Sequence, residues 1–356
     1  MQKLQFEALR HIGLTLAAAQ ELIRLLEHHR DAVPVRVTEV HRETVRLDDG
    51  TQDLAARRMP SLARGLADQD DAVAVGDWGL ARRDAHGDWW LTHCLTPFSA
   101  LARRDGDGIR HIVVSNVDTA LLVMGLDLDF SLRRIERFLA LVQASGVQPV
   151  VVLSKPDLCA DVPRALAQLN GRLPAQVPRL VVDGRSPEAA GALAPWLRPA
   201  QTLVLLGSSG AGKSTLANSL LGVALQSTGA TREGDGRGRH TTTSRSLHRL
   251  PGGACLIDTP GVRTLRPDAS EASLAASFDD VARLSLQCRF RDCSHQGEPG
   301  CAVREGVDGD RLDNFHKLQR EMRRDTLNAL ERRRQLSEWK ARGRAGRANL
   351  RAKRGE

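Results

Sequence analysis

The fold of this chain is decided by one stretch, Leu203-Val204-Leu205-Leu206-Gly207-Ser208-Ser209-Gly210-Ala211-Gly212-Lys213-Ser214-Thr215. Its four leading apolar residues predict a buried strand, and the remainder fits the pattern G-x-x-x-x-G-K-[ST]. The pattern opens a predicted helix, Leu216–Leu221, and a loop between strand and helix is the context in which it binds phosphate. Backbone N–H groups and the helix N-terminus then surround the anion. We therefore predict a phosphate-binding loop over Gly207–Thr215; the alternative is an ordinary glycine-rich turn.

Lysine is scarce in this sequence, which makes the lysine of the loop informative. Of the 51 Lys and Arg residues, six are Lys. Lys213 is expected to reach the β- and γ-phosphates of a nucleotide, and the Ser214 hydroxyl is expected to bind Mg²⁺. Farther along, Asp258-Thr259-Pro260-Gly261 follows a predicted hairpin of Ser244–Leu250 and Ala254–Asp258. Asp258 is expected to hold the Mg²⁺ shell, and the Gly261 N–H to sense a γ-phosphate.

A second loop carries features of base recognition. The predicted strand Val150–Leu153 leads into Ser154-Lys155-Pro156-Asp157, which resembles the N-K-x-D element of GTP-binding proteins. The Asp157 carboxylate is expected to accept both N–H groups on the edge of guanine, with the Lys155 stem across the ring. Ser154 stands where Asn is usual, so a side chain that joins loop to loop is shortened. The alternative is a surface turn.

The order of these loops is unusual. The base loop precedes the phosphate loop, whereas ordinary GTPases have it afterwards. All the parts are present in a rotated order, so we predict a circularly permuted P-loop domain within a multidomain α/β protein. The predicted parts are helices at 1–32, a small OB-like β-barrel at 33–105, the permuted GTPase domain at 106–270, a helical zinc-binding domain at 271–330 and a basic tail at 331–356.

Four residues near the C-terminus have the spacing of metal ligands. Cys288, Cys293, His295 and Cys301 supply three thiolates and one imidazole within 14 residues. Soft and borderline ligands without a carboxylate are typical of a closed, structural Zn²⁺ site, one per chain. Disulfides and reduced, unligated thiols are the alternatives.

The net charge is concentrated in the tail. The whole chain carries +8, and residues 320–356 alone carry 13 basic and 5 acidic residues. Such a segment indicates binding to a phosphate polymer or an anionic lipid, and the alternative is a solvated helix face with a frayed end. Trp78, Trp89 and Trp90 of the predicted barrel either belong to its core or stack on bases.

These features together resemble the small-ribosomal-subunit biogenesis GTPases of the RsgA type. Further matching phrases are Val75-Gly76-Asp77-Trp78, Asn116-Val117-Asp118 and Gly238-Arg239-His240-Thr241-Thr242. The resemblance implies an OB-fold, a permuted GTPase and a zinc domain. It also implies hydrolysis of GTP to GDP that is faster on the small subunit, late in maturation, with rRNA bound by the flanking domains. Departures are Ser154, and Asp183-Gly184 where the family often has Ser-Ala.

The group that handles the attacking water is not obvious from the sequence. Val262 follows Gly261, where Ras-like enzymes have a Gln, so weak intrinsic hydrolysis is expected. The Gly- and Arg-rich segment Gly234–Thr243 is predicted to be a switch loop. In it, Thr242 is expected to complete the Mg²⁺ coordination and His240 to orient the water or act as a base. The alternative is that His240 packs or contacts rRNA.

No apolar stretch approaches the roughly 20 residues of a membrane span. Ile12–Ala19 resembles the core of a signal peptide, but the amphipathic rhythm continues through Leu26, so we expect a helix and a cytoplasmic, monomeric protein. Other functions are open: a P-loop ATPase or kinase, a nucleic-acid-binding P-loop NTPase with no ribosomal role, and a nucleic-acid or zinc binding module with a vestigial G domain.

Overall fold

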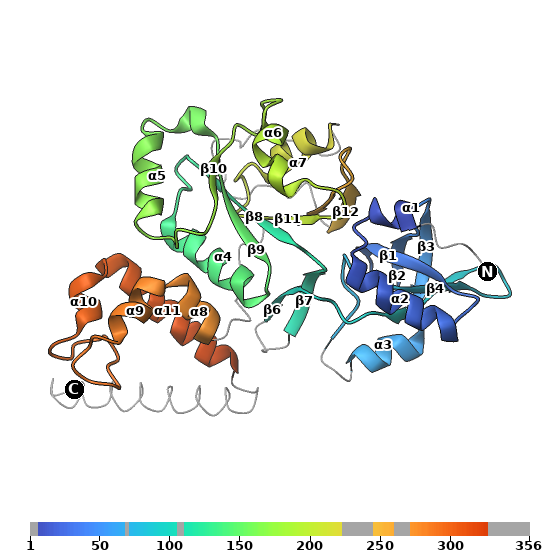
Figure 1. Cartoon of the computed structure of the whole chain (residues 1–356), viewed down its shortest axis with the longest axis horizontal. Coiled ribbons are helices and arrows are strands. Elements are labelled where there is room, and N and C mark those ends of the chain that lie inside the picture. The colour runs from blue at the N-terminus through green and yellow to red at the C-terminus, as the bar shows by residue number, and fades with distance from the viewer. Residues whose placement is uncertain (1–5, 68–70, 105–109, 223–244, 260–270, 327–356) are drawn as a thin grey trace, which may run out of the picture.

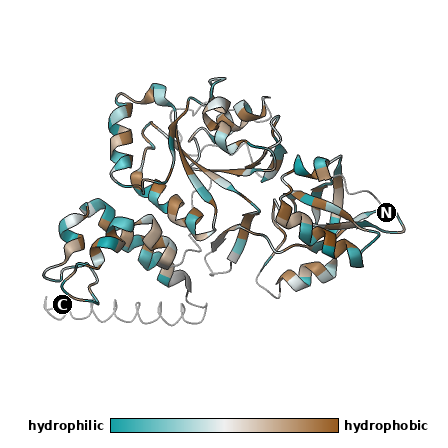
Figure 2. Cartoon of the chain, in the orientation of Figure 1, coloured by the Kyte–Doolittle hydropathy of each residue, from teal (hydrophilic) through white to brown (hydrophobic). Residues whose placement is uncertain are grey.

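The structure is a computed structural model, and it describes residues 6–67, 71–104, 110–222, 245–259 and 271–326. Three units lie along its long axis: a β-barrel, a central α/β unit and a helical C-terminal unit (Figure 1). Hydrophobic residues gather on the strands and on the inward faces of the helices (Figure 2). The predicted multidomain architecture is therefore confirmed. The predicted domain boundaries at 105, 270 and 330 lie in segments outside the described residues and stay predictions.

The barrel is a closed sheet of five strands. Its order is β1-β2-β3-β5-β4, and β4 pairs back onto β1. Neighbours are antiparallel except for β3 and β5, which are parallel. Alternate side chains such as Val35, Val37, Val45 and Leu47 fill the interior, as period-2 patterning requires. The strands are β1 (Val33–Val40), β2 (Thr44–Asp48), β3 (Asp53–Arg58), β4 (Trp78–Arg83) and β5 (Trp89–Cys94), with helix α3 (Pro60–Ala67) between β3 and β4.

Two helices precede the barrel and cover one side of it. They are α1 (Phe6–Arg10) and α2 (Leu16–His28), and Thr15 caps the N-terminus of α2, since its Oγ1 accepts a hydrogen bond from the Ala18 N–H. Leu9, Ile12 and Leu22 pack with Trp78, which is only 1% exposed. Trp78 is therefore a core residue and is not available to stack on a base. No helix within the described ranges has the length and apolar character to cross a membrane.

The central unit is one sheet between two layers of helices. The order β10-β9-β8-β11-β13 is parallel throughout, and β12 is added antiparallel at the end. Helices α4 and α5 cover one face, and α6 and α7 cover the other (Figure 1). The strands are β8 (Thr119–Gly125), β9 (Gln148–Ser154), β10 (Arg179–Val181), β11 (Thr202–Leu206), β12 (Ser246–Arg249) and β13 (Cys255–Asp258). The helices are α4 (Leu132–Ala144), α5 (Val162–Asn170), α6 (Ala189–Leu193) and α7 (Lys213–Leu221), with short 3₁₀ turns η1 (Pro156–Leu158) and η2 (Ala194–Trp196).

The barrel and the central unit are joined through backbone and side chains. Glu39 of β1 pairs with Ser246 of β12, so the two sheets form one sheet of 11 strands. Arg249 of β12 donates to the buried Asp48 of β2, from its Nε at 2.8 Å. A hairpin of β6 (Ala100–Arg104) and β7 (Arg110–Ser115) lies between the two units in the chain. These contacts fix the barrel against the edge of the central sheet.

Arg36 of β1 is the side chain that completes this junction. Its guanidinium is fully buried, and burial lowers its pKa against the pull of nearby acidic groups. It donates to three backbone carbonyls, those of Ile12 (2.5 Å), Gly76 (3.2 Å) and Asn116 (2.9 Å), and to Thr202 Oγ1 (2.9 Å). One fork of N–H donors thus joins the N-terminal segment, the barrel, the linker and strand β11.

The C-terminal unit packs its helices on α4. They are α8 (Glu271–Ser277), α9 (Asp279–Ser285), α10 (Ala302–Gly306) and α11 (Gly309–Thr326). The fully buried Glu136 of α4 accepts from Arg311 at 2.7 Å and from the Asn314 amide at 2.6 Å, both on α11. Arg311 also donates to Asp280 of α9, from Nε at 2.8 Å. Since α11 continues to Thr326 and its Met322 is buried, a truncation meant to spare this helix must begin after residue 326.

Replacing Arg36 should destabilise the protein strongly. Arg36→Ala removes the donor shared by buried acceptors in four segments, of which the Gly76 carbonyl oxygen keeps a hydrogen bond from the Asn116 amide. We therefore expect a loss of roughly 3–5 kcal/mol in the free energy of unfolding. The control is Arg82→Ala, which removes an exposed ion pair to Asp31 (3.4 Å) and should cost less than about 1 kcal/mol. Urea denaturation followed by circular dichroism measures both. Equal losses would contradict the role given to Arg36.

Candidate functional site: a phosphate loop beside a base loop

The candidate site lies where the parallel strands of the central sheet end. In an open α/β sheet, ligands bind outside the carboxyl ends of the strands. Strand β8 ends before Asp127, β9 ends at Ser154, β11 ends before Gly207 and β13 ends at Asp258. The topology therefore brings the base loop, the phosphate loop and Asp258 to one edge of the sheet, although they come from distant parts of the chain.

The phosphate loop lies close against β8 and turns through glycines. A Cβ on Gly207 would be 2.3 Å from the Val123 carbonyl oxygen, so this close approach requires glycine. Gly210 and Gly212 have φ of 81° and 89°, which an L side chain rarely adopts. Helix α7 then starts at Lys213. The loop has the strand–loop–helix geometry that the sequence predicts.

Lys213 is held inside this loop. Its Nζ donates to the carbonyl oxygens of Gly207 (3.0 Å) and Ser208 (2.7 Å), and the residue is 7% exposed. Burial lowers the pKa of Lys213 to about 8, while Asp258 and Asp129 act in the opposite direction. The ammonium thus lies at the centre of the loop with two carboxylates near enough to influence it.

The base loop touches the phosphate loop directly. The Ser154 hydroxyl is buried and donates to the Ala211 carbonyl oxygen at 2.6 Å. A Cβ on Gly212 would be 3.3 Å from the same hydroxyl. The short side chain that replaces the usual Asn therefore still joins the two loops, because the backbones approach closely. This contact connects residues 57 positions apart in the chain.

The other residues of the base loop are oriented by charged partners. Lys155 has a left-handed backbone (φ 57°), and its Nζ bonds to Asp127 Oδ2 at 2.7 Å. Asp157 lies in the turn η1, and its Oδ2 accepts from Arg185 Nη2 at 2.8 Å. The side chain of Asp157 is 44% exposed, so its carboxylate lies at the surface of the site.

Sequence reasoning missed Asp127, Asp129 and Arg185. Asp129 accepts a hydrogen bond from the Ser208 hydroxyl of the phosphate loop, and Arg134 of α4 pairs with Asp129. A usable signal was present for the two acidic residues, since they follow directly after a buried apolar strand. Arg185 offered no such signal. The predicted residues His240, Thr242 and Gly261 lie outside the described residues.

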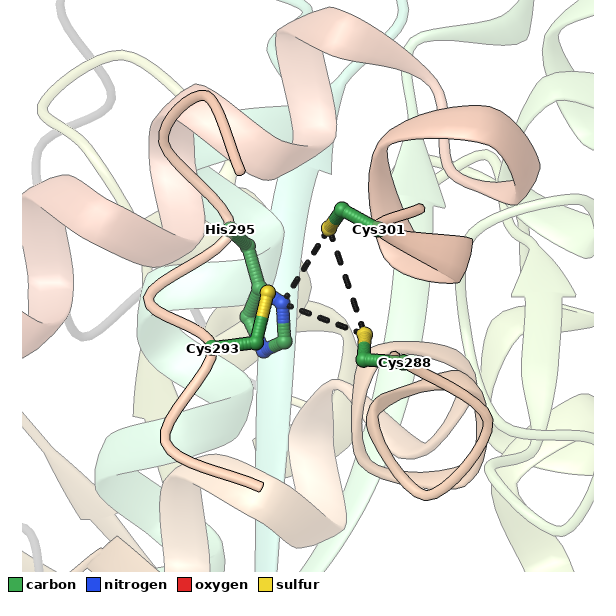
Figure 3. A group of neighbouring side chains, drawn as sticks. All are labelled: Cys288, Cys293, His295 and Cys301. Atoms are coloured by element: carbon green, nitrogen blue, oxygen red, sulfur yellow. Dashed lines mark hydrogen bonds between the residues drawn. The ribbon is translucent and has the colours of Figure 1, made fainter. Parts of the chain in front are cut away.

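The C-terminal unit holds a second group of convergent side chains. Cys288, Cys293, His295 and Cys301 point toward one another (Figure 3), and their ligand atoms all lie within 4.8 Å. His295 Nδ1 is 3.7 Å from Cys288 Sγ and 3.4 Å from Cys301 Sγ, and the two sulfurs are 4.0 Å apart. Ligands about 2.3 Å from a tetrahedral ion are separated by roughly 3.8 Å, so these spacings fit a single metal ion.

The backbone helps to shape this group. His295 has φ of 61° and Gly300 has φ of 72°, so both sit at left-handed turns. A Cβ on Gly300 would come within 3.1 Å of the Arg289 side chain, which explains why glycine stands there. The two turns bring Cys293, His295 and Cys301 back toward Cys288, which follows the end of α9.

A five-stranded barrel, a permuted P-loop sheet and a helical unit with a Cys₃His group define a class, the circularly permuted GTPases. The comparisons agree with this assignment. The family model described as RsgA GTPase matches residues 96–267. Relatives named "Small ribosomal subunit biogenesis GTPase RsgA" from Xanthomonas euvesicatoria pv. vesicatoria and Xanthomonas oryzae pv. oryzae (strain MAFF 311018) are each 44% identical over 303 residues, covering 83% of this chain and 82% of theirs. The chain belongs to the RsgA GTPase family and is a GTP hydrolase.

Two solved structures have the same fold. YjeQ from Thermotoga maritima superposes with a TM-score of 0.60 at 24% identity, over 82% of this chain and 98% of that one. YloQ, described as a circularly permuted GTPase, gives a TM-score of 0.57 at 21% identity, over 83% of this chain and 96% of its own. The predicted permutation is therefore confirmed.

Removing the Ser154 hydroxyl should weaken nucleotide binding. Ser154→Ala deletes the hydrogen bond between the two loops, so we expect the dissociation constant for GDP to rise about five-fold, the equivalent of roughly 1 kcal/mol. Fluorescence titration with GDP carrying a ribose-linked fluorophore measures it. Ser145→Ala is the matched control, because its hydroxyl also donates to a carbonyl, that of Leu141 at 3.1 Å, at the C-terminal end of α4. An unchanged affinity in Ser154→Ala would rule out this contribution.

Proposed function

We propose that this chain is a ribosome-dependent GTPase that assists late maturation of the small (30S) ribosomal subunit, acting as a cytoplasmic monomer. Its relatives are named small ribosomal subunit biogenesis GTPases, and the identity extends over most of both chains. The observation that carries the proposal is the 2.6 Å hydrogen bond from Ser154 to Ala211. This bond holds a candidate guanine-reading loop against a phosphate loop, which is the arrangement that a GTP site requires.

In this proposal, different residues of the site bind the phosphates and the base of the nucleotide. Backbone N–H groups of Gly207–Thr215 bind the phosphates, and Lys213 turns from its carbonyl partners toward the β- and γ-phosphates. Asp157 accepts the two N–H groups of guanine, while Lys155, oriented by Asp127, lies across the base. Asp157 favours this function over an ATPase or kinase, because adenine lacks that pair of donors.

Magnesium fits the donor set beside Lys213. The Ser214 hydroxyl and the Asp258 carboxylate are the hard oxygen ligands that Mg²⁺ prefers, and Asp258 is close enough to Lys213 to influence its pKa. Mg²⁺ would neutralise charge on the phosphates during hydrolysis. The proposal also includes Thr242 as a further Mg²⁺ ligand, Gly261 as the γ-phosphate sensor and His240 as the residue that orients water.

Zinc is our proposal for the metal of the Cys₃His group. Three thiolates and one imidazole with tetrahedral spacing are typical of a closed structural Zn²⁺ site. Cys288 and Cys301 pack with the apolar core of helices α8–α11, so the ion would hold that core together. In this proposal each chain binds one zinc ion with a structural role, and GTP is hydrolysed in the central unit.

A basic cavity between the C-terminal unit and α4 of the central unit supports rRNA binding. It has a volume of about 680 Å³ and lies between α4, α10, α11 and the loop of His295. Its charged lining is mostly positive and includes Arg133, Arg304, Lys317, Arg320 and the acidic Asp313. Arg304, Lys317 and Arg320 make no ion pair with any other residue that the structure describes. Cationic side chains left without carboxylate partners are suited to contact a phosphate backbone.

Purified small subunits should stimulate hydrolysis of GTP by this protein. We expect a basal rate near that of unstimulated Ras, about 10⁻⁴ s⁻¹, and a rise of at least roughly ten-fold with small subunits. Phosphate release in single-turnover assays measures both rates, with large subunits as the control. Equal rates with and without small subunits would refute the ribosomal role, whereas hydrolysis of ATP at the same rate would refute guanine selectivity.

The salt dependence of small-subunit binding locates the electrostatic contacts. The affinity for small subunits should fall as the salt concentration rises. Lys317→Ala or Arg320→Ala should each reduce the slope of the logarithm of the affinity against the logarithm of the salt concentration by about one, because one phosphate contact is lost. Arg198→Ala is the control, since this exposed residue precedes β11 at the opposite edge of the sheet. Slopes that match the control would exclude the cavity as an rRNA contact.

Loss of zinc should affect the C-terminal unit and leave the nucleotide site unchanged. Cys293→Ser should lower bound zinc from about one per chain and loosen helices α8–α11, while GDP affinity stays near that of the parent. Elemental analysis and hydrogen exchange measure the two effects. Cys159→Ser is the matched control, because Cys159 is half-buried and lies outside the Cys₃His group. Full zinc content in Cys293→Ser would contradict the ligand assignment.

A further inference from the structure

The carboxylate assigned to guanine already has a partner within the chain. Arg185 Nη2 lies 2.8 Å from Asp157 Oδ2. Arg185 belongs to the loop after β10, in the sequence Asp183-Gly184-Arg185-Ser186. Arg185 directly follows the departure from the family pattern at Asp183-Gly184 and brings a cation to the base loop.

The loop that carries Arg185 is held in place. Asp183 Oδ1 accepts from the Arg185 backbone N–H at 3.0 Å and from Arg185 Nε at 3.3 Å. A Cβ on Gly184 would be 3.4 Å from the Leu216 backbone nitrogen, so the loop lies against the first turns of α7. The guanidinium of Arg185 is charged at neutral pH, and Asp157 and Asp183 raise its pKa further. The pairing is thus a property of an organised loop next to the nucleotide site.

A guanidinium and the edge of guanine present the same chemistry to a carboxylate. Both offer N–H donors from neighbouring nitrogens of one planar group, and a carboxylate accepts them side by side. Arg185 and guanine consequently compete for the oxygens of Asp157. The side chains of Arg185 and Asp157 are 63% and 44% exposed, so their pair is a surface ion pair that can open without disturbing the core.

We propose that Arg185 is an intramolecular competitor of guanine that sets the affinity of the base site. This inference rests on the proposed function of Asp157. Guanine binds after the guanidinium has left the carboxylate, so the pair lowers the affinity for GDP and GTP alike. When the base dissociates, Arg185 returns to Asp157, and the charge of the carboxylate is again compensated.

The experiment compares Arg185→Ala with the parent chain, using GDP that carries a ribose-linked fluorophore. Loss of the competitor should raise the association rate and lower the dissociation constant by about two- to five-fold, the range expected for an exposed ion pair. Raising the salt concentration should reduce this difference, because salt screens the pair. Arg198→Ala is the control, since it removes an exposed arginine at the opposite edge of the sheet. Unchanged or weaker binding in Arg185→Ala would overturn the proposal.

The same comparison in an Asp157→Asn protein distinguishes failure of this inference from failure of the proposed function. Asp157→Asn should lose affinity for GDP and gain affinity for xanthosine diphosphate, because an amide can donate to the 2-oxo group of xanthine. In this background Arg185→Ala should not change the binding of xanthosine diphosphate, since the guanidinium no longer has a carboxylate to occupy. If Asp157→Asn binds GDP as the parent does, the base-site assignment fails. If it loses GDP and Arg185→Ala still has no effect in the parent background, only the competitor fails.

Discussion

The parallel packing of β8 between β9 and β11 is the constraint on which the site depends. Strands β9 and β11 both pair in register with β8, so the carboxyl ends of all three strands lie side by side at one edge of the sheet. The phosphate loop can follow β11 only because Gly207 has no side chain to strike the Val123 carbonyl oxygen. At that edge the Ser154 hydroxyl meets the Ala211 carbonyl oxygen. Order within the sheet, rather than order along the chain, decides which loops meet, so a permuted chain can build the same pocket.

Much of the fold could be predicted from the sequence because its signals are local. Apolar runs such as Val150–Leu153 mark buried strands, and the one-sided apolar pattern after Ser131 marks α4. The glycines and Lys213 of the phosphate loop are recognisable because the backbone geometry leaves few alternatives. The Cys₃His spacing likewise predicted a group that does converge. In each case the residues that decide the structure lie within a short segment.

The rest depends on residues that are distant in the sequence. Arg36 reads as an ordinary charged position in an alternating strand, yet it is fully buried, because its acceptors come from four segments. Asp129 and Arg185 are placed by loops whose neighbours are decided only when the sheet is assembled. The replacement of Asn by Ser154 appeared to weaken the link between loops, whereas the close approach of the two backbones preserves it. Such pairings carry no periodicity that a sequence pattern can reveal.

The junction around Arg36 also has a consequence for synthesis. Thr202, one of its four partners, is encoded 166 residues later. At about 5–20 residues per second, a translating ribosome needs roughly ten seconds or more to add that stretch. During this interval the Arg36 guanidinium of the newly made barrel lacks one of its four hydrogen-bond acceptors. The strand that delivers the phosphate loop thus also completes the polar junction beside the barrel, and a nascent fragment that stops before Thr202 lacks one of the four hydrogen-bond acceptors of Arg36.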